Sequence, residues 1–360
     1  LTKDTAQPPS WRGDVEGKAD LVEEIIRIYG YDKLEAISVR PLDATGENAE
    51  TPAVTRKRLA RGALASRGLN ECVTWSFMSK SLASDFGGAD NGLTLSNPIN
   101  SEWDQMRPSI LGNLISAANN NADKGQMDVA LFEVGPVFRS SKVDGQETTA
   151  TGIRFGNNGP RHWTGSDANR VNDVYDVKAD AIAALNAAGA PTGNLQTARE
   201  ASDYFHPGRS AVLKLGKNVL AQFGEIHPGI LDDMKIKTPV MGFEVFLDNI
   251  PESKKKGSAK ANLNLSAFQS VKRDFAFIVD ENVDVEDILR AAKGADRNLI
   301  TDVTVFDVYQ GKGVDEGKKS IAINVVLQPV KETLTDKQIE EISASIVKAV
   351  SDKTGAVLRG

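Results

Sequence analysis

The segment VTVFDVYQGKGVDEGKKSIAINVVL, residues 303–327, decides the fold of the last part of the chain. Its two apolar runs, 303–309 and 320–327, flank a loop that contains glycine and aspartate, and this pattern predicts a β-hairpin. A shorter apolar run upstream, FAFIV at 275–279, predicts another strand. The residues AVLR, 356–359, are expected to close the domain as a last strand.

Two helices are predicted around this hairpin. The segment 283–295 carries apolar residues at helical spacing, namely Val285, Ile288, Leu289 and Ala292. The segment 337–352 repeats that pattern after the N-cap candidates Thr335 and Asp336, and Gly355 can end it. The order of elements is that of a ferredoxin-like βαββαβ domain, in which one face of the sheet is open. An open sheet face can receive unpaired nucleotide bases by stacking.

Composition limits the class of protein. A length of 360 residues suggests two or three domains. A single cysteine, Cys72, excludes a disulfide framework and fits a reducing compartment, so we expect a cytoplasmic protein. No apolar run approaches the roughly 20 residues that span a bilayer, and no signal-like segment opens the chain, so no membrane partner is expected.

The charge of the chain does not predict RNA binding. The net charge is −6, which argues against a general electrostatic footprint for nucleic acid. Residues 268–360 carry 13 lysines and arginines against 16 aspartates and glutamates, a net of −3. Any RNA contact in this domain is therefore expected to depend on a local patch and on stacking.

A carboxylate cluster lies near the start of the chain. Asp14 is predicted to cap a helix over 15–29, which would place three acidic residues on one arc, Asp20, Glu23 and Glu24. Such an oxygen-rich cluster suits Mg²⁺. The alternative is a solvated acidic first turn that complements the helix dipole, with Glu23 pairing Arg27, and spacing by itself favours this alternative.

The middle of the chain carries few motifs of its own. We expect a basic amphipathic helix over 55–69, a strand over 71–77, and a pair of buried strands within 129–139. His206 and His227 each precede a proline and have no metal-ligand spacing, so structural roles are expected. Dinucleotide, Walker and nucleophile-elbow motifs do not occur in the sequence.

Several segments resemble one known family. FQSVKRDFAFIVD, DVYQGKGVDEGKKSIAINVVLQP and TLTDKQIEEI resemble the anticodon-binding domain of the bacterial phenylalanyl-tRNA synthetase beta chain. PSWRGDVEGKADLVEEIIRIYGYD resembles the B5 module of that chain. Between them, NPINSEWDQMRPSILGNLI, ALFEVGPVF, FHPGRSA and FGEIHP resemble its catalytic-like domain. The match covers nearly the whole sequence in the order of the family, but the family's chain is much longer, so we expect a C-terminal fragment.

The resemblance implies an α+β protein in several parts. Residues 1–42 would be a truncated B5 helical segment, and 43–251 a class II synthetase-like antiparallel sheet with flanking helices. Residues 252–266 would be a linker, and 267–360 the ferredoxin-fold anticodon-binding domain.

The resemblance also implies sites. The family's magnesium site, shared with the alpha chain, falls on Asp14, Asp20, Glu23 and Glu24. Its anticodon contacts fall on Tyr309, which could stack on a base, and on Ser320, which could hydrogen-bond a base edge or ribose. Further candidates for phosphate neutralisation are Lys318, Lys319 and Arg359.

No residue of this chain is expected to be catalytic. Active class II synthetases use a motif 3 arginine to clamp ATP phosphates, and Asn249 stands where that arginine is expected. Glu244 and Phe246 replace glycines that let nucleotide approach the backbone. The chain is therefore expected not to bind ATP, which the holoenzyme would use.

The implied partners are the synthetase alpha subunit, in an alpha2beta2 heterotetramer, and tRNA(Phe). The basic helix and the apolar surface of the middle domain would serve assembly, and editing would belong to a part N-terminal to this sequence. The alternative is a free-standing RNA-binding or assembly module derived from the beta chain.

Overall fold

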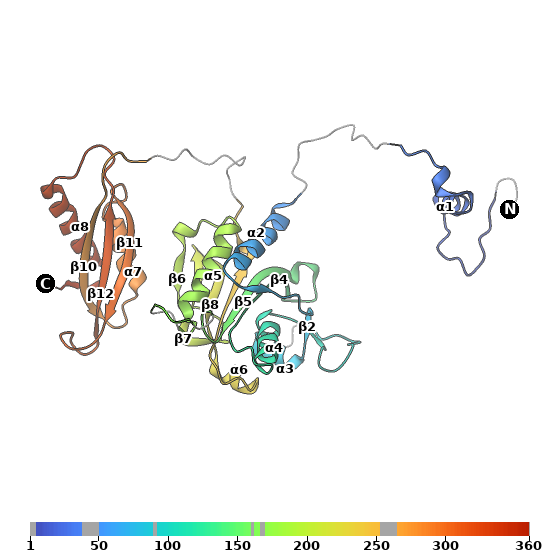
Figure 1. Cartoon of the computed structure of the whole chain (residues 1–360), viewed down its shortest axis with the longest axis horizontal. Helices are drawn as coiled ribbons and strands as arrows, with labels where there is room; N and C mark the ends of the chain where they lie inside the picture. Colours follow the sequence, from blue (N-terminus) through green and yellow to red (C-terminus); the bar gives the residue numbers. More distant parts are fainter. Residues whose placement is uncertain are drawn as a thin grey trace. The chain divides into compact units, whose positions relative to one another are not determined.

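The computed structural model describes residues 5–37, 50–88, 92–159, 162–165, 170–252 and 265–359. The chain divides into two compact units, Leu1–Ala49 and Glu50–Gly360 (Figure 1). No helix in the described ranges is long and apolar enough to cross a membrane. Most of the predicted linker, 252–266, lies outside the described residues.

The first unit is built on helix α1, Lys18–Tyr29, which is followed by a short 3₁₀ helix, η1, Tyr31–Lys33. Gly17 is the N-cap, and the Asp20 carboxylate accepts its backbone N–H at 2.7 Å. The prediction that Asp14 caps a helix from residue 15 is wrong, because the Asp14 carboxylate is bound by Arg12 instead. No residue of α1 is buried, and Ile28 at the end of its apolar stripe is 77% exposed.

The second unit contains a middle domain and a last domain. The middle domain is built on a seven-stranded sheet in the order β1-β4-β5-β9-β8-β7-β6. Neighbouring strands are antiparallel except β1 and β4, which are parallel. The strands are β1 Asn70–Glu71, β4 Val129–Phe138, β5 Gln146–Phe155, β6 Gln196–Ala198, β7 Phe205–Leu215, β8 Asn218–Ile226 and β9 Val240–Phe246. A separate pair consists of β2 Phe77–Met78 and β3 Gln105–Met106.

Two strand predictions in this domain are wrong. Residues 72–76 lie outside any strand, so the expected strand over 71–77 is divided between β1 and β2. The expected strand pair within 129–139 is the single strand β4, and its antiparallel partner is β5. Local apolar runs indicate extended backbone, but only the pairing of distant segments decides where a strand begins and ends.

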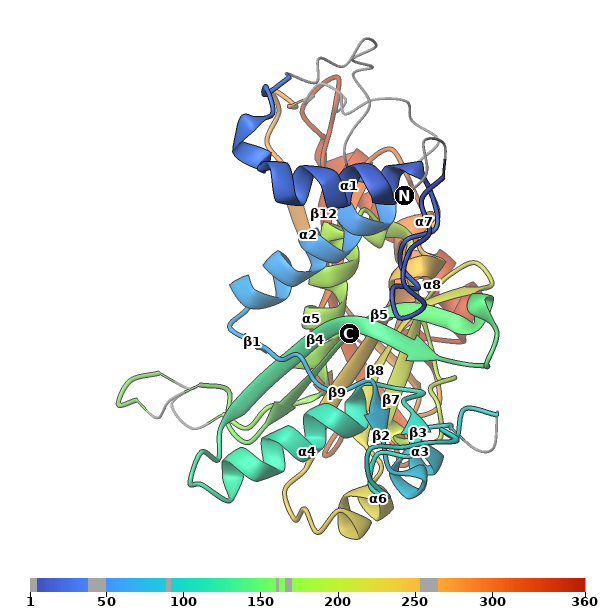
Figure 2. The ribbon, with the colours of Figure 1, turned by 90° about the vertical axis from the view of Figure 1, so that its right-hand side faces the viewer.

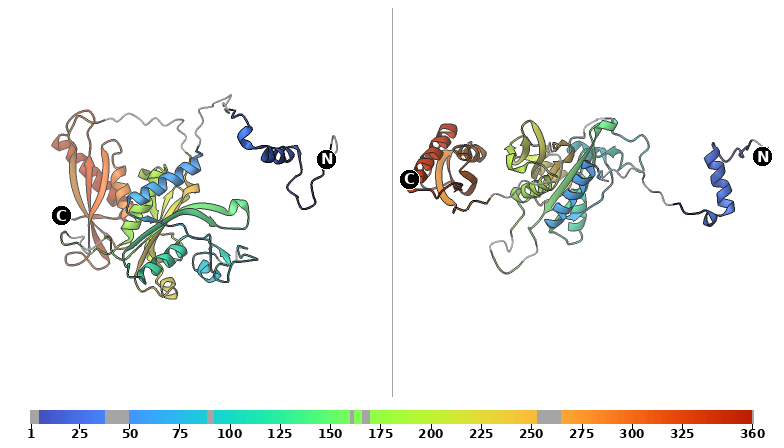
Figure 3. Two further views of the ribbon diagram at one scale, coloured as in Figure 1. Left: turned by 45° about the vertical axis from the view of Figure 1, so that its right-hand side comes forward. Right: turned by 90° about the horizontal axis from the view of Figure 1, so that it is seen from above.

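Helices cover both faces of this sheet. The helices are α2 Pro52–Ser66, α3 Lys80–Asp85, α4 Leu111–Ala122, α5 Val174–Ala187 and α6 Pro228–Asp233, with 3₁₀ turns at Val143–Gly145, Thr192–Asn194 and Leu247–Asn249. Along β4, Leu131 belongs to one buried cluster and Phe132 to the other, and successive strand residues point to opposite faces. The cluster with Phe132 contains α2 and α5, whereas the cluster with Leu131 contains α4. Figures 2 and 3 show these helices on opposite sides of the β4–β5 pair.

The last domain confirms the predicted ferredoxin-like order. Its four-stranded antiparallel sheet has the order β11-β12-β10-β13. The strands are β10 Val271–Asp280, β11 Ile300–Tyr309, β12 Lys318–Leu327 and β13 Val357–Leu358, and the helices are α7 Val285–Gly294 and α8 Asp336–Thr354. Thr335 caps α8 with a capping box, and Gly355 ends it in the left-handed conformation. One buried core joins both helices to one face of the sheet, so the α+β class is confirmed.

Candidate functional site

Strand alternation divides the last sheet into a helix face and an open face. Phe275, Phe277 and Val279 of β10 lie in the core shared with α7 and α8. Ile278, between the last two, therefore faces the other side of the sheet. Ser320 is paired with Ile278 and also with Tyr309, so these three residues form a row across the open face.

Three predicted RNA contacts meet at one end of this row. Tyr309 on β11 is 38% exposed, and its register partner Ser320 on β12 is buried. Arg359 follows β13; its Nη1 donates to Ser320 Oγ at 3.5 Å, and its guanidinium lies 5.8 Å from the centroid of the Tyr309 ring. An aromatic ring, a hydroxyl and a permanent positive charge thus lie side by side, which is the set of groups that can stack on a base, bond its edge and neutralise its phosphate.

Of the two predicted lysines, Lys319 lies on the other face of the sheet, and Lys318 lies on the open face opposite a carboxylate. Lys319 lies directly opposite Val279 in the sheet, and Val279 belongs to the helix face, so Lys319 is on that face as well. The Lys319 Nζ donates to the backbone oxygen of Glu281 at 2.8 Å. Lys318 lies directly opposite Asp280, and a carboxylate at that position lowers the local positive potential. The positive charge of the Tyr309 cluster is therefore supplied by Arg359.

The centre of the middle domain is filled by a buried carboxylate, Glu244 on β9. Three donors surround it: Ser109 Oγ at 2.6 Å, Tyr204 Oη at 2.6 Å and Gln222 Nε2 at 2.7 Å. Burial raises the pKa of Tyr204 well above its usual value, and the negative charge of Glu244 raises it further. The phenol therefore keeps its proton and acts as a donor. The Glu244 carboxylate is satisfied within the protein, as a buried charge requires.

A cavity of about 870 Å³ lies beside this network. Its lining includes three carboxylates, Asp85, Glu200 and Asp203, and one arginine, Arg139, which already pairs with Glu147. Burial, together with the charge of Asp233, raises the pKa of Asp85. Such a lining is unfavourable for a polyphosphate, because like charges repel at close range.

Asn249 lies in the turn that follows β9. Its Nδ2 donates to the backbone oxygen of Val219 at 3.0 Å. A neutral amide held in this way cannot supply the bidentate, permanently charged contact that an arginine gives to phosphate.

Two buried ionic networks hold the middle domain together. Arg107, just before α4, is 1% exposed. Its Nη2 donates to Glu133 Oε1 at 2.8 Å, its Nε donates to the backbone oxygen of Pro136, and its Nη1 donates to Thr74 Oγ1. Each charge is paired and hydrogen-bonded, which is the condition for burying it.

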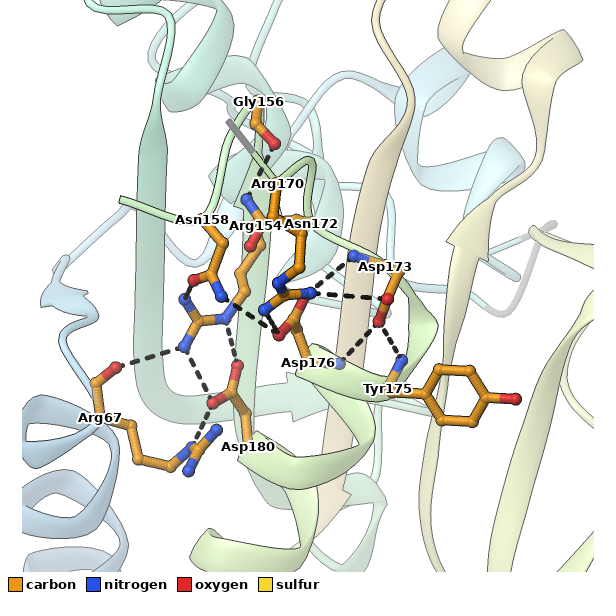
Figure 4. Close-up of polar contacts among 10 residues, drawn as sticks. All are labelled: Arg67, Arg154, Gly156, Asn158, Arg170, Asn172, Asp173, Tyr175, Asp176 and Asp180. Atoms are coloured by element: carbon orange, nitrogen blue, oxygen red, sulfur yellow. Dashed lines mark hydrogen bonds and ion pairs between the residues drawn. The ribbon is translucent and has the colours of Figure 1, made fainter. Parts of the chain in front are cut away.

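The second network was not predicted (Figure 4). Asp180 on α5 is fully buried. Its carboxylate accepts a hydrogen bond from Arg154 Nε at 2.6 Å and another from the guanidinium of Arg67. It joins three elements, since Arg154 lies on β5 and Arg67 follows α2. The sequence could have indicated a buried ion pair here, because Asp180 lies between Val177 and Ala184 on the apolar side of its helix.

The arginines of α2 are largely used inside the domain. Arg56 donates to the backbone oxygens of Leu247 and Pro251, and Arg61 donates to that of Val134. Two of the arginines of this helix therefore anchor it to the rest of the domain, while Arg58 is exposed and pairs with Glu50.

Two of the four predicted magnesium ligands in the first unit, Asp14 and Glu24, take arginine partners. Arg12 Nη2 lies 2.7 Å from Asp14 and 2.6 Å from Glu24, and Arg27 lies 2.6 Å from the other oxygen of Glu24. Hydrogen bonds from Arg12 lower the pKa of Asp14 to about 2, and those from Arg12 and Arg27 lower the pKa of Glu24 to about 2. Asp20 accepts backbone N–H groups at the start of α1.

These carboxylates do not fit a magnesium ion as they stand. Across the described ranges, no three histidine, cysteine, aspartate or glutamate side chains are grouped so that they could hold a metal. A cation at Asp14 and Glu24 would first have to displace the Arg12 guanidinium.

His206 and His227 have the structural roles expected of them. His206 Nδ1 accepts the N–H of Gly208 at 3.0 Å, and His227 Nδ1 accepts that of Gly229 at 3.1 Å. Each side chain thus stabilises a His-Pro-Gly turn. Cys72 is partly buried, and desolvation raises the pKa of its thiol, which makes it a poor nucleophile.

Comparison with known proteins matches three family descriptions to the chain. Residues 38–247 match the CLM domain of the phenylalanyl tRNA synthetase beta chain, which is more than half of the sequence. The chain belongs to this beta-chain family. Residues 266–359 match the ferredoxin-fold anticodon binding domain, and residues 3–31 match the tRNA synthetase B5 domain.

Curated relatives carry the same family name. The phenylalanine–tRNA ligase beta subunit of Bradyrhizobium diazoefficiens is 52% identical over 357 residues, and that of Rhodospirillum rubrum is 48% identical over 353. Each alignment covers 98% of this chain but 44% of the relative, so the chain spans less than half the length of these proteins. Among solved structures, a pyrrolysyl tRNA synthetase of Desulfitobacterium hafniense aligns with a TM-score of 0.42 at 16% identity, covering 54% of this chain and 64% of the other.

Proposed function

We propose that this chain is part of the beta subunit of phenylalanine–tRNA ligase, where it binds the anticodon region of tRNA(Phe) and packs on the catalytic alpha subunit. It would thereby support the ATP-dependent attachment of phenylalanine to tRNA in the cytoplasm. The observation that carries the proposal is the cluster of Tyr309, Ser320 and Arg359 on the open face of the anticodon-binding-type domain.

Each member of the cluster has a separate task in the proposal. The Tyr309 ring stacks on an unpaired base, an interaction worth about 1–3 kcal/mol. Ser320 bonds a base edge or ribose, and Arg359 neutralises a neighbouring phosphate. Lys318 and Lys319 contribute only to phosphate binding further from the stacked base. In a domain with a net charge of −3, stacking has to supply more of the affinity than charge does.

The chain itself has no catalytic residue in this proposal. Glu244 and its three donors occupy the centre of the middle domain, and Asn249 offers an amide in place of a phosphate-binding arginine. ATP is therefore bound by the alpha subunit, not by this chain.

An apolar surface beside α4 supports the proposed assembly with alpha. Val73 is 91% exposed and Trp75 58%, both line one hollow with Asn113 of α4, and the Trp75 ring packs against Trp103 with centroids 5.7 Å apart. Exposed aromatic and aliphatic groups of this kind are typical of subunit interfaces. We infer that this surface, rather than the α2 arginines, contacts alpha in the alpha2beta2 heterotetramer.

Magnesium binding by Asp14, Asp20, Glu23 and Glu24 is proposed only for the assembled ligase. The test is a magnesium titration of the alpha–beta complex and of its Asp20→Asn, Glu24→Gln variant. A changed magnesium dependence of adenylate formation supports the site, whereas an unchanged dependence refutes it and leaves Asp14 and Glu24 as partners of arginine.

The proposal as a whole is tested by co-purification with an alpha subunit and by binding of the complex to tRNA(Phe) with native or altered anticodons. Stable assembly and a preference for the native anticodon are expected. The second candidate function is a free-standing RNA-binding module. RNA binding without any assembly would favour that alternative.

A further inference from the structure

The turn that follows β11 closes on the ring of Tyr309. The Tyr309 hydroxyl donates to the backbone oxygen of Lys312 at 3.1 Å. Between these two residues, Gly311 has a φ of +146°, a backbone conformation that side-chain-bearing residues rarely adopt. The chain can therefore fold back over the hydroxyl end of the ring only through a residue such as glycine.

Gly311 also touches the ring directly. A Cβ atom built on Gly311 would lie 3.1 Å from Tyr309 Oη and 3.3 Å from Cζ, closer than Cβ atoms normally approach other atoms. The absence of a side chain thus lets backbone and ring pack together. Any larger residue has to move either the turn or the ring.

Arg359 restrains the ring from another direction. Its guanidinium lies 5.8 Å from the ring centroid and also donates to Ser320 on the neighbouring strand. The ring is therefore held at its hydroxyl end by the 310–313 turn and beside its π-system by a cation. A side chain fixed before binding does not lose its rotational freedom when a ligand arrives, and this raises affinity.

We propose that Gly311 is a positioning residue for RNA binding, because it lets the turn hold the Tyr309 ring in the orientation that receives a base. This inference rests on the proposed function, in which Tyr309 stacks on an anticodon base. Gly311 itself contacts no RNA in the proposal, so its effect has to pass through Tyr309.

A double-mutant cycle separates this role from a merely structural one. The variants are Gly311→Ala, Tyr309→Ala and the double variant in the full chain, and the probe is the anticodon stem-loop RNA of tRNA(Phe). Tyr309→Ala should weaken binding roughly 5- to 150-fold, the loss of one stacked base. Gly311→Ala should cause a large part of that loss alone and almost none when Tyr309 is already alanine, since coupled residues are not additive.

Gly317 provides the matched control in the same loop. It also has a positive φ, +77°, but a Cβ atom there would meet nothing within 4 Å. Gly317→Ala should strain the backbone without touching Tyr309, so RNA affinity should stay within about twofold of wild type. Thermal unfolding of each variant reports its general stability.

Two further readouts keep the inference testable if Gly311→Ala folds poorly. Tyr309→Phe keeps the ring but removes the bond to Lys312, so it should weaken binding in the same direction and less than Tyr309→Ala. NMR of the protein labelled at its five tyrosines should show a shifted or broadened Tyr309 ring signal in Gly311→Ala and not in Gly317→Ala.

The outcomes distinguish the two proposals. If Tyr309→Ala binds the RNA as wild type does, the proposed anticodon site is wrong and this inference falls with it. If Tyr309→Ala weakens binding while the Gly311→Ala effect is absent or fully additive, the site stands and the positioning role of Gly311 is refuted.

Discussion

The residues of the proposed RNA site on the last sheet have different surroundings. Tyr309 presents a partly exposed ring on the open face, and Arg359 lies beside it with a permanent charge. Lys319 belongs to the other face, where its ammonium is bonded to the backbone of Glu281. Stacking and charge neutralisation are separable contributions to affinity, so variants at these positions should differ in salt dependence as well as in strength.

Tyr309→Ala should weaken binding of tRNA(Phe) by the alpha–beta complex by about 1–3 kcal/mol, because one stacked base is lost. The slope of log affinity against log salt should not change, since no phosphate contact is removed. A salt titration of binding measures both quantities.

Arg359→Ala should instead reduce the magnitude of that slope by about 1, because one phosphate contact is lost. Lys319→Ala is the matched control, and its effect on the slope should be smaller because Lys319 faces away from the cluster. A larger slope change in Lys319→Ala than in Arg359→Ala would place the phosphate path on the opposite face of the sheet from Tyr309.

At the scale of elements, buried ion pairs decide how the helices of the middle domain are held. Asp180 joins α5 to β5 through Arg154 and to the end of α2 through Arg67. Because the carboxylate is fully buried, its removal leaves the charge of Arg154 without a partner in a poorly solvated place.

Asp180→Asn should lower the free energy of unfolding by about 3–5 kcal/mol, the usual cost of breaking a buried pair. Glu147→Gln is the control; it breaks the exposed pair with Arg139 and should cost at most about 1 kcal/mol. Denaturant unfolding of both variants gives the comparison, and equal losses would contradict the structural role of the network.

The turn before α1 should respond to acid. The folded pKa values of Asp14 and Glu24 are lowered to about 2 from ordinary values of 3.8 and 4.5. A lowered pKa means that the ion pairs with Arg12 contribute fully above pH 4.5 and are lost as the pH falls towards 2.

We therefore expect the NMR signal of the Arg12 Nε–H group to be constant from neutral pH down to about 4.5 and to move only below it. Arg12→Gln is the control: it should raise the pKa of Asp14 towards its ordinary value and that of Glu24 only in part, because Arg27 still pairs with Glu24. Titration of Glu24 near its ordinary value in the wild-type protein would show that the pairs do not form.

At the scale of the whole molecule, a beta-chain CLM domain is combined with an anticodon-binding-type domain, and the proposal gives the nucleotide site to the alpha subunit. The space beside β9 is occupied by Glu244 and its donors, and the adjoining cavity is rich in carboxylates. The division of labour proposed here follows from this, since the reaction then has to take place on the alpha subunit.

The purified chain alone should show no phenylalanine-dependent exchange of pyrophosphate into ATP. Addition of the alpha subunit should restore exchange, which also controls for the quality of the preparation. Measurable exchange by the chain, free of alpha, would mean that the Glu244 network opens to admit nucleotide and that the proposal of an inactive scaffold is wrong.

The sequence by itself determined the last domain and the order of its strands and helices along the chain. Short-range signals are sufficient there, because two strands are joined by one glycine-containing loop and α8 carries both of its caps, Thr335 and Gly355. The family resemblance placed Tyr309 and Ser320, and their register pairing follows from the same hairpin.

Tertiary structure alone decided the rest. Arg359 lies beside Tyr309 because its backbone N–H donates to the backbone oxygen of Ala276, a contact between segments far apart in sequence. The same is true of Asp180 and its two arginines, and of Arg12, which also binds Glu24, 12 residues further along the chain. A carboxylate or an arginine has the same local pattern whether it meets water, a metal or another side chain, so only the fold settles which partner it has.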